Sequence, residues 1–208
     1  MDLKAVIFDY GEVLSYPPTA ADTAQLAGFF GVSVDRLPAL WEKNRGPYDR
    51  GDLTPEVYWS MLAQDAGIQI DQKRLDEISA LDLAMWSNIN SSMVEWMHRL
   101  SSAGMKVGLL SNMQPTMVAH CRRQFAWIND FDFATFSGEV RMIKPDAAIY
   151  DYTLNGLGAK AAETLFLDDR ERNIEAAKAL GIHALRFHSV EQLRGELKQI
   201  GFKIFPQD

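Results

Sequence analysis

The chain has 208 residues, 47% hydrophobic and 24% charged, which fits one large folded domain or a core with a modest insertion. Its net charge of −7, with no run of Lys and Arg to offset it, argues against nucleic acids and anionic membranes as partners. A single cysteine, Cys121, excludes an internal disulfide and fits a reducing compartment; we interpret it as a packed helix residue.

The first predicted element is a buried strand at residues 5–8, which delivers Asp9 at its carboxyl end. The chain enters this strand without the apolar core of a signal peptide, and no segment approaches the roughly 20 apolar residues of a membrane span. We therefore expect a cytoplasmic protein. Ligands and catalytic groups gather at the carboxyl ends of strands in open α/β sheets, although many strands end in an Asp that merely caps a turn.

The next interval contains helical patterns and no convincing strand. Three patterns cover residues 20–30, 34–44 and 75–86. A fourth helix begins at Thr54-Pro55, an N-cap followed by a proline at the first helical position. We interpret residues 16–88 as a helical cap inserted after the first strand.

This division leaves residues 1–15 and 89–208 as the α/β core. A cap inserted at this point lies above the carboxyl ends of the strands, where it can select substrates. Its rings and one guanidinium could contact a polar, sugar-like substrate, although core packing or an ordinary surface charge is the simpler interpretation for each; they are Trp41, Arg45, Tyr48 and Trp59.

The rest of the chain alternates strands with helices. Strands are expected at residues 106–110, 164–167 and 183–187, with a weaker candidate at 133–137. Helices are expected from Ser91 or Ser92 to Gly104, from Gln114 or Pro115 onward, from Asp146 to Gly156 or Gly158, and over 172–180 before Gly181. This order predicts a doubly wound parallel sheet.

Polar side chains follow these strands. Ser111 and Asn112 stand at a predicted helix N-terminus, which suits an anion as well as it suits a simple cap. Lys144 precedes a proline, so its backbone is held extended and its ammonium can be directed toward a bound phosphate. An ordinary solvated lysine is the alternative.

The strongest signal is the pair Asp168-Asp169 at the end of a buried strand. Like charges about 4 Å apart repel by on the order of 4 kcal/mol at an effective dielectric of about 20. Adding Asp9 and a phosphate makes the pocket untenable without a cation, and Mg²⁺ prefers such oxygen ligands. Helix capping explains one of these acids but hardly both.

Together, Asp9, Ser111, Lys144 and Asp168-Asp169 resemble the four motifs of the haloacid dehalogenase superfamily, in order and over nearly the whole chain. The segments Phe-Asp-Tyr-Gly-Glu-Val-Leu, Leu-Ser-Asn, Lys-Pro-Asp and Leu-Asp-Asp-Arg resemble those of small sugar-phosphate phosphatases and of the N-terminal phosphatase domain of epoxide hydrolase. The helical interval resembles the cap of that superfamily.

The resemblance implies a Mg²⁺-dependent phosphatase that acts on a small phosphorylated metabolite through an aspartyl-phosphate; a sugar phosphate is one candidate. Asp9 would be the nucleophile, and Ser111, the Asn112 backbone and Lys144 would bind the phosphoryl oxygens. Mg²⁺ would be held by Asp9, the Gly11 backbone carbonyl and Asp169, with Asp168 acting through a water molecule and Asn173 bracing the loop. Arg45 is a weaker candidate for contacting the rest of the substrate.

One departure concerns Gly11. Most phosphatases of the superfamily carry a second aspartate there as general acid, and losing such a group costs about 10² to 10⁴ in rate. Glu12, a cap residue or a water molecule could replace it; on an extended backbone Glu12 would point away from Asp9. Gly11 also keeps two other functions open: a 2-haloacid dehalogenase and a weakly active or inactive binding protein. The sequence does not decide between monomer and homodimer.

Overall fold

The structure is a computed structural model that describes residues 2–207. Its centre is one sheet of five parallel strands in the order β3-β2-β1-β4-β5. The strands are β1 (Ala5–Phe8), β2 (Lys106–Ser111), β3 (Phe133–Phe136), β4 (Thr164–Asp168) and β5 (His183–Arg186). The predicted doubly wound parallel sheet is confirmed, and the predicted strand ends differ by one residue at most.

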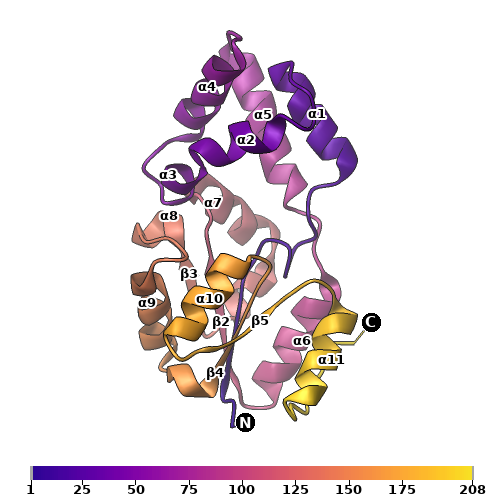
Figure 1. Ribbon diagram of the computed structural model, residues 1–208, viewed down its shortest axis with the longest axis vertical. Helices are drawn as coiled ribbons and strands as arrows, with labels where there is room; N and C mark the ends of the chain where they lie inside the picture. The colour runs from indigo at the N-terminus through magenta and orange to yellow at the C-terminus, as the bar shows by residue number, and fades with distance from the viewer. Residues whose placement is uncertain (1, 208) are drawn as a thin grey trace.

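Helices cover both faces of this sheet (Figure 1). Successive residues of β1 explain why, because Val6 and Phe8 pack into one core while Ala5 and Ile7 pack into the other. The first face carries α6 (Ser91–Ser102), α7 (Pro115–Gln124) and α11 (Val190–Gln199), and the second carries α9 (Ala147–Leu157) and α10 (Glu171–Ala179). Short turns are η1 (Ala126–Asp130), α8 (Ser137–Val140) and η2 (Ala161–Glu163).

In the core, two helix starts differ from prediction by one residue; in the inserted segment, the helices expected at 34–44 and 75–86 are Leu37–Lys43 and Gln72–Met85. The N-cap of α6 is Asn90 rather than Ser91 or Ser92, and α10 begins at Glu171 rather than Arg172. Neither helix has a side-chain cap hydrogen bond, so no capping contact fixes its first residue. Within residues 2–207, no helix has both the length and the apolar character needed to cross a bilayer.

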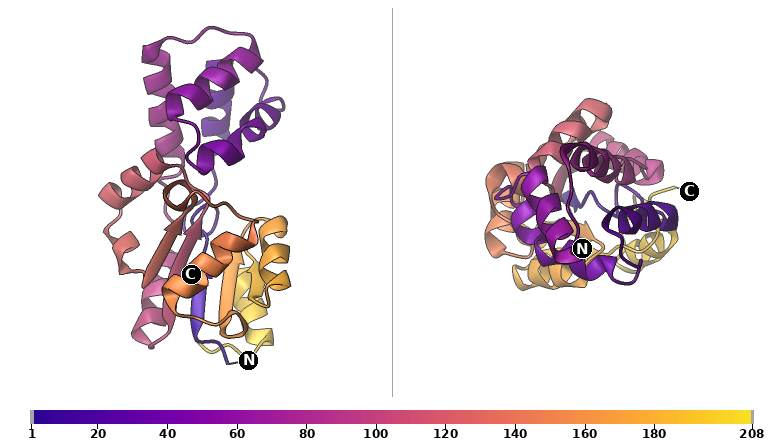
Figure 2. Two further views of the ribbon diagram at one scale, coloured as in Figure 1. Left: turned by 90° about the vertical axis from the view of Figure 1, so that its left-hand side faces the viewer. Right: turned by 90° about the horizontal axis from the view of Figure 1, so that it is seen from above.

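The inserted segment forms a separate helical layer with its own hydrophobic core. Its helices are α1 (Ala20–Phe30), α2 (Leu37–Lys43), α3 (Arg45–Asp49), α4 (Pro55–Ala66) and α5 (Gln72–Met85). Thr54 caps α4 as predicted. The short α3 was not predicted, because Gly46 and Pro47 disfavour a helix. Figure 2 shows this cap beyond the carboxyl ends of the strands.

The two chain segments that join cap and core run side by side. Tyr16 N donates to Asn88 O over 2.7 Å, and Asn90 N donates to Leu14 O over 2.9 Å. Ser15 and Ile89 form an isolated antiparallel bridge between them. The boundaries at residues 15/16 and 88/89 stay a prediction, and this pairing supports them.

Candidate active site

Three acids converge where β1 and β4 end. These strands are hydrogen-bonded neighbours with Phe8 opposite Leu167, so Asp9 and Asp168 leave the sheet side by side. Carboxylate oxygens of Asp9, Asp168 and Asp169 lie within 4.8 Å of one another. Asp9 is 7% exposed and Asp168 is fully buried, so their charges lie where water screens them poorly.

Lys144 lies between two of these acids. Its Nζ is 2.9 Å from Asp9 Oδ1 and 2.6 Å from Asp168 Oδ2. It also donates to the Leu110 carbonyl over 2.9 Å, and the side chain is buried. Burial alone would lower the pKa of Lys144, but Asp168 and Asp9 raise it above its ordinary value. Lys144 is therefore a fixed positive charge.

One ammonium does not balance three carboxylates. Burial raises the pKa of Asp9 to about 8, although Lys144 opposes the rise. Burial and then the charges of Asp168 and Glu12 raise the pKa of Asp169 to about 6. A divalent cation would keep these groups ionised, and carboxylate oxygens are the donors that a hard cation such as Mg²⁺ prefers. The residues present thus fit a magnesium site.

Asp168 is held by hydrogen bonds to both of its oxygens. The Asn173 amide donates to Oδ1 and Oδ2 over 2.9 and 3.0 Å, and the Arg170 backbone N–H donates to Oδ1 over 2.8 Å. With Lys144 on Oδ2, these partners fix the orientation of the carboxylate. The predicted brace by Asn173 therefore has a direct contact, made to Asp168.

The loops after β2 and β3 complete the floor of the site. Ser111 ends β2 and is 3% exposed. The Asn112 side chain accepts from Lys144 N over 2.8 Å and donates to Lys144 O over 3.0 Å, which positions the lysine backbone. Only the Asn112 backbone was predicted to matter.

Ser137 was not predicted as part of the site. Its Oγ accepts from Met113 N over 2.8 Å and donates to the Asp49 carbonyl over 2.6 Å, so it joins the loop after β2 to the cap. A signal existed, because Ser137 follows β3 directly and so lies at the same edge of the sheet.

A cavity of about 540 Å³ lies between this floor and the cap. It is lined by Asp9, Ser111, Lys144 and Asp169 below, and by Leu37, Trp41, Arg45 and Trp86 among others above. A Cβ at Gly11 would lie 3.4 Å from Trp86 Cζ3, so an indole ring covers the position where a general acid would stand. Nothing in the sequence pattern pointed to Trp86.

The predicted cap residues divide into two groups. Trp41 and Arg45 line the cavity, whereas Tyr48 and Trp59 are 1% and 0% exposed and belong to the cap core. Core packing, the simpler of the two interpretations, therefore holds for Tyr48 and Trp59, because both fill the space between cap helices. Arg45 Nε donates to both Asp49 oxygens over 2.8 and 3.0 Å, so Arg45 is not a free cation.

Two further predictions concern single residues. Glu12 has a left-handed backbone with φ of 58°, so the extended backbone assumed for it is wrong; it is exposed at the edge of the cavity. Cys121 is fully buried, and burial raises the pKa of its thiol to about 11, which agrees with a packed helix residue.

This fold and acid cluster define an α/β protein with a doubly wound parallel sheet and a carboxylate directly after its first strand. A sequence model described as haloacid dehalogenase-like hydrolase matches residues 3–181. The chain belongs to the haloacid dehalogenase-like hydrolases, and the family resemblance drawn from its motifs is confirmed.

Two curated relatives come from Aspergillus. The sesquiterpene phosphatase astK of Aspergillus oryzae is 28% identical over 95% of this chain and 96% of its own length. The drimenol cyclase drtB of Aspergillus calidoustus is 24% identical over 95% of this chain, which spans only 36% of that longer protein.

A solved structure shares the fold. The enzyme bt-2542 of Bacteroides thetaiotaomicron, in complex with magnesium and inorganic phosphate, superposes with a TM-score of 0.72 at 21% identity. The match covers 92% of this chain and 98% of that one. At this identity the likeness establishes the fold, including the helical insertion after β1.

Proposed function

We propose that this chain is a Mg²⁺-dependent phosphatase that hydrolyses a small phosphorylated metabolite through an aspartyl-phosphate on Asp9. The observation that carries the proposal is the cluster of Asp9, Asp168 and Asp169 around Lys144 at the floor of the cavity between core and cap. The sesquiterpene phosphatase that matches nearly end to end supports it, as does magnesium with phosphate in bt-2542.

Each residue then has a stated task. Asp9, the Gly11 carbonyl and Asp169 would hold Mg²⁺, with Asp168 acting through a water molecule; the bound ion offsets charge on the phosphate and on the attacking carboxylate. An Asp9 oxygen forms a bond to phosphorus while the bond to the leaving oxygen breaks, and that oxygen takes a proton from water, from Glu12 or from a cap residue, the sources that Gly11 leaves open. Water then attacks phosphorus, releasing phosphate and free Asp9.

The remaining groups position the phosphoryl oxygens. Ser111 and the Asn112 backbone would donate to them, and Lys144 would offset their charge. Because Lys144 is held by Asp168, by the Leu110 carbonyl and through its backbone by Asn112, little reorganisation is needed when substrate binds.

The decisive experiment presents the purified protein with phosphorylated metabolites, p-nitrophenyl phosphate and 2-chloropropionate, with and without Mg²⁺. Phosphate release that requires Mg²⁺ is expected. Chloride release without metal would instead identify a 2-haloacid dehalogenase, which leaves Asp169 without a task. Turnover of none of these compounds would indicate a binding protein on this scaffold.

A further inference from the structure

Above the acid cluster, the cavity has an apolar wall. Its buried and half-buried members come from both cap and core: Leu37, Trp41, Trp86, Met113, Met117 and Ile143. From this wall we infer that the site takes monophosphates whose alcohol portion is apolar, an inference that rests on the proposed function for the place of the phosphate. Sugar phosphates are then poor substrates.

The apolar surface begins beside the reacting phosphate. Trp86 lies against Gly11, and Met113 follows the loop that would bind the phosphoryl oxygens. The polar atoms of this apolar surface are covered: Trp86 Nε1 is buried, and the Tyr10 hydroxyl donates to the Trp86 carbonyl over 2.8 Å. The first carbons beyond the phosphate therefore meet ring and thioether surface.

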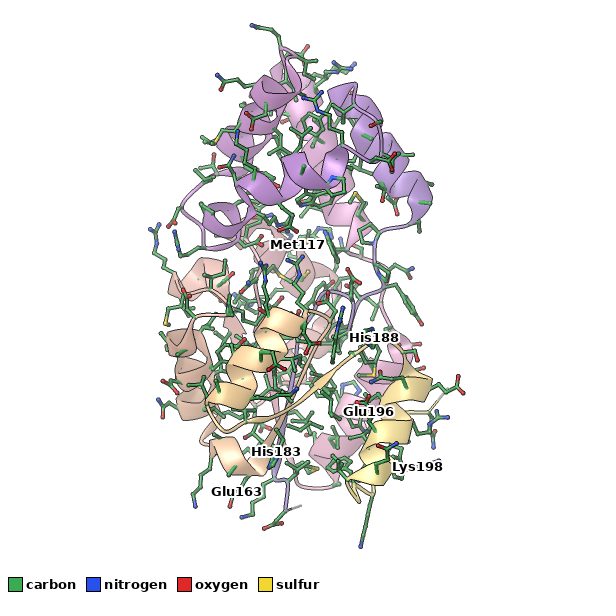
Figure 3. The ribbon with its side chains drawn as sticks, viewed as in Figure 1. Met117, Glu163, His183, His188, Glu196 and Lys198 are labelled. Carbon is green, nitrogen blue, oxygen red and sulfur yellow. The ribbon has the colours of Figure 1, made fainter. Side chains whose placement is uncertain are left out.

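The far side of the cavity continues this surface. An added Cβ at Gly46 of α3 would lie 3.9 Å from Ile143 Cδ1, so cap and core close together there. Leu37 of the cap is 1% exposed, and Met117 of α7 is 4% exposed. Figure 3 shows Met117 where the core meets the cap, far from Glu163 and His183 at the opposite end of the sheet.

Charged groups on the cavity wall are paired or stand at its edge. Arg45 and Asp49 neutralise each other, and Arg45 Nη1 is out of contact with solvent. Glu42, Arg170 and Arg172 are exposed, and Glu42 and Arg170 lie 3.5 Å apart, across the edge between cap and core. Sugar hydroxyls would find few free partners inside, and burying an unpaired hydroxyl is unfavourable.

The first test is a ligand series that needs no turnover. Binding of n-alkylphosphonates from methyl to octyl is measured by calorimetry in the presence of Mg²⁺. We expect affinity to rise about fourfold per methylene, equivalent to about 0.8 kcal/mol, until the cavity is filled. Affinity that does not change with chain length overturns the inference.

A matched pair of substrates tests the same point during turnover. Hexyl phosphate and glucose 6-phosphate are both primary phosphate esters with six carbons, so they differ mainly in the polarity of the body. We expect kcat/KM to favour hexyl phosphate by more than about tenfold. Equal values, or a preference for the sugar, would contradict an apolar site.

Met117→Gln places an amide in the wall at nearly constant volume. Octylphosphonate affinity should fall about fivefold, and methylphosphonate affinity much less. Met61→Gln, on the cap helix α4 and away from the cavity, is the control and should change neither. Equal losses for both ligands would count against Met117 as part of the wall.

These experiments distinguish failure of the proposed phosphatase function from failure of the apolar-substrate inference. Failure of the phosphatase function appears as no Mg²⁺-dependent phosphate release from any ester, p-nitrophenyl phosphate included, whereas the phosphonate series still measures the wall. Conversely, turnover of p-nitrophenyl phosphate with a flat phosphonate series overturns the substrate class alone.

Discussion

Core and cap each bury a cluster of charged side chains, and the two clusters are satisfied very differently. In the core, both Asp168 oxygens and the Lys144 ammonium have partners at 2.6 to 3.0 Å, and only the amide oxygen of Asn173, among the described atoms of this cluster, is buried without one. In the cap, Arg45 and Asp49 pair, but Arg45 Nη1 and Asp82 Oδ1 are buried without a partner. The core cluster is thus held in one arrangement, whereas the cap cluster leaves two buried polar atoms without hydrogen bonds.

The difference follows from how each region places its side chains. Parallel strands bring Asp9 and Asp168 to the same edge of a rigid sheet, and short loops add the partners. The cap brings Arg45 from a five-residue helix against Asp82 of α5. The edge of the core sheet suits chemistry that requires charges at fixed positions. The cap suits contacts to the rest of the substrate, which need no fixed charge.

Asp9→Asn should break the core cluster with the largest effect. The change is nearly isosteric, and the amide oxygen can still accept from Tyr10 N, so the fold should persist. Turnover should fall by about 10⁴-fold or more, because the amide is not a nucleophile. Steady-state phosphate release measures the loss, and circular dichroism checks the fold. Asp151→Asn, exposed on α9, is the matched control; substantial activity in Asp9→Asn would remove Asp9 from its proposed role.

The dependence of the rate on the leaving group shows whether a cap residue replaces the general acid that the core lacks at Gly11. Gly11 offers no acid, and Trp86 covers it. Aryl phosphates, whose leaving oxygens need no proton, should therefore be hydrolysed about 10² to 10⁴ times faster than alkyl phosphates of similar size. The ratio of kcat for phenyl and cyclohexyl phosphate measures it. A ratio near one would mean that another residue, Glu12 or one from the cap, delivers the proton.

Lys144→Met tests how strongly the core cluster depends on its buried cation. The substitution leaves Asp9 and Asp168 buried without their counter-charge, which should lower the free energy of unfolding by about 3–5 kcal/mol. Urea unfolding with and without Mg²⁺ measures the change, and bound metal should recover part of it. Lys160→Met, at an exposed position, controls for the substitution. An unchanged midpoint would show that the two acids are not charged in the folded protein.

The same contrast explains what the sequence could predict. Short apolar strands ending in Asp9, Ser111 and Asp168 define both the sheet and the site, because parallel strands align their carboxyl ends. No comparable rule predicts which side chains of the cap face the cavity. Trp41 faces the cavity and Trp59 fills the cap core, yet both are aromatic residues in helical patterns.

The place of Trp86 and the side-chain role of Asn112 were not predicted, for related reasons. Trp86 is the residue after α5, and its position over Gly11 depends on how the connecting segment turns back toward the core. Asn112 acts through side-chain hydrogen bonds to the Lys144 backbone, 32 positions away, which no local pattern specifies.

Asp82→Asn tests the buried charge cluster of the cap, and we expect it to have the smallest effect of these variants, on stability alone. Burial raises the pKa of Asp82 from its ordinary value of 3.8 to about 6, with Arg45 opposing the rise. The folded protein therefore binds this proton more tightly than the unfolded chain, and the stability associated with it is lost as pH rises through about 6.

Asn does not ionise, so the stability of the variant relative to the parent should improve by about 1 kcal/mol between pH 5 and pH 8. Thermal unfolding at the two pH values measures this difference, with Asp76→Asn, at an exposed position of the same helix, as the matched control. If the stability difference between variant and parent is the same at both pH values, Asp82 does not ionise in the folded protein. The charge cluster of the cap then destabilises the fold less than its unpaired atoms indicate.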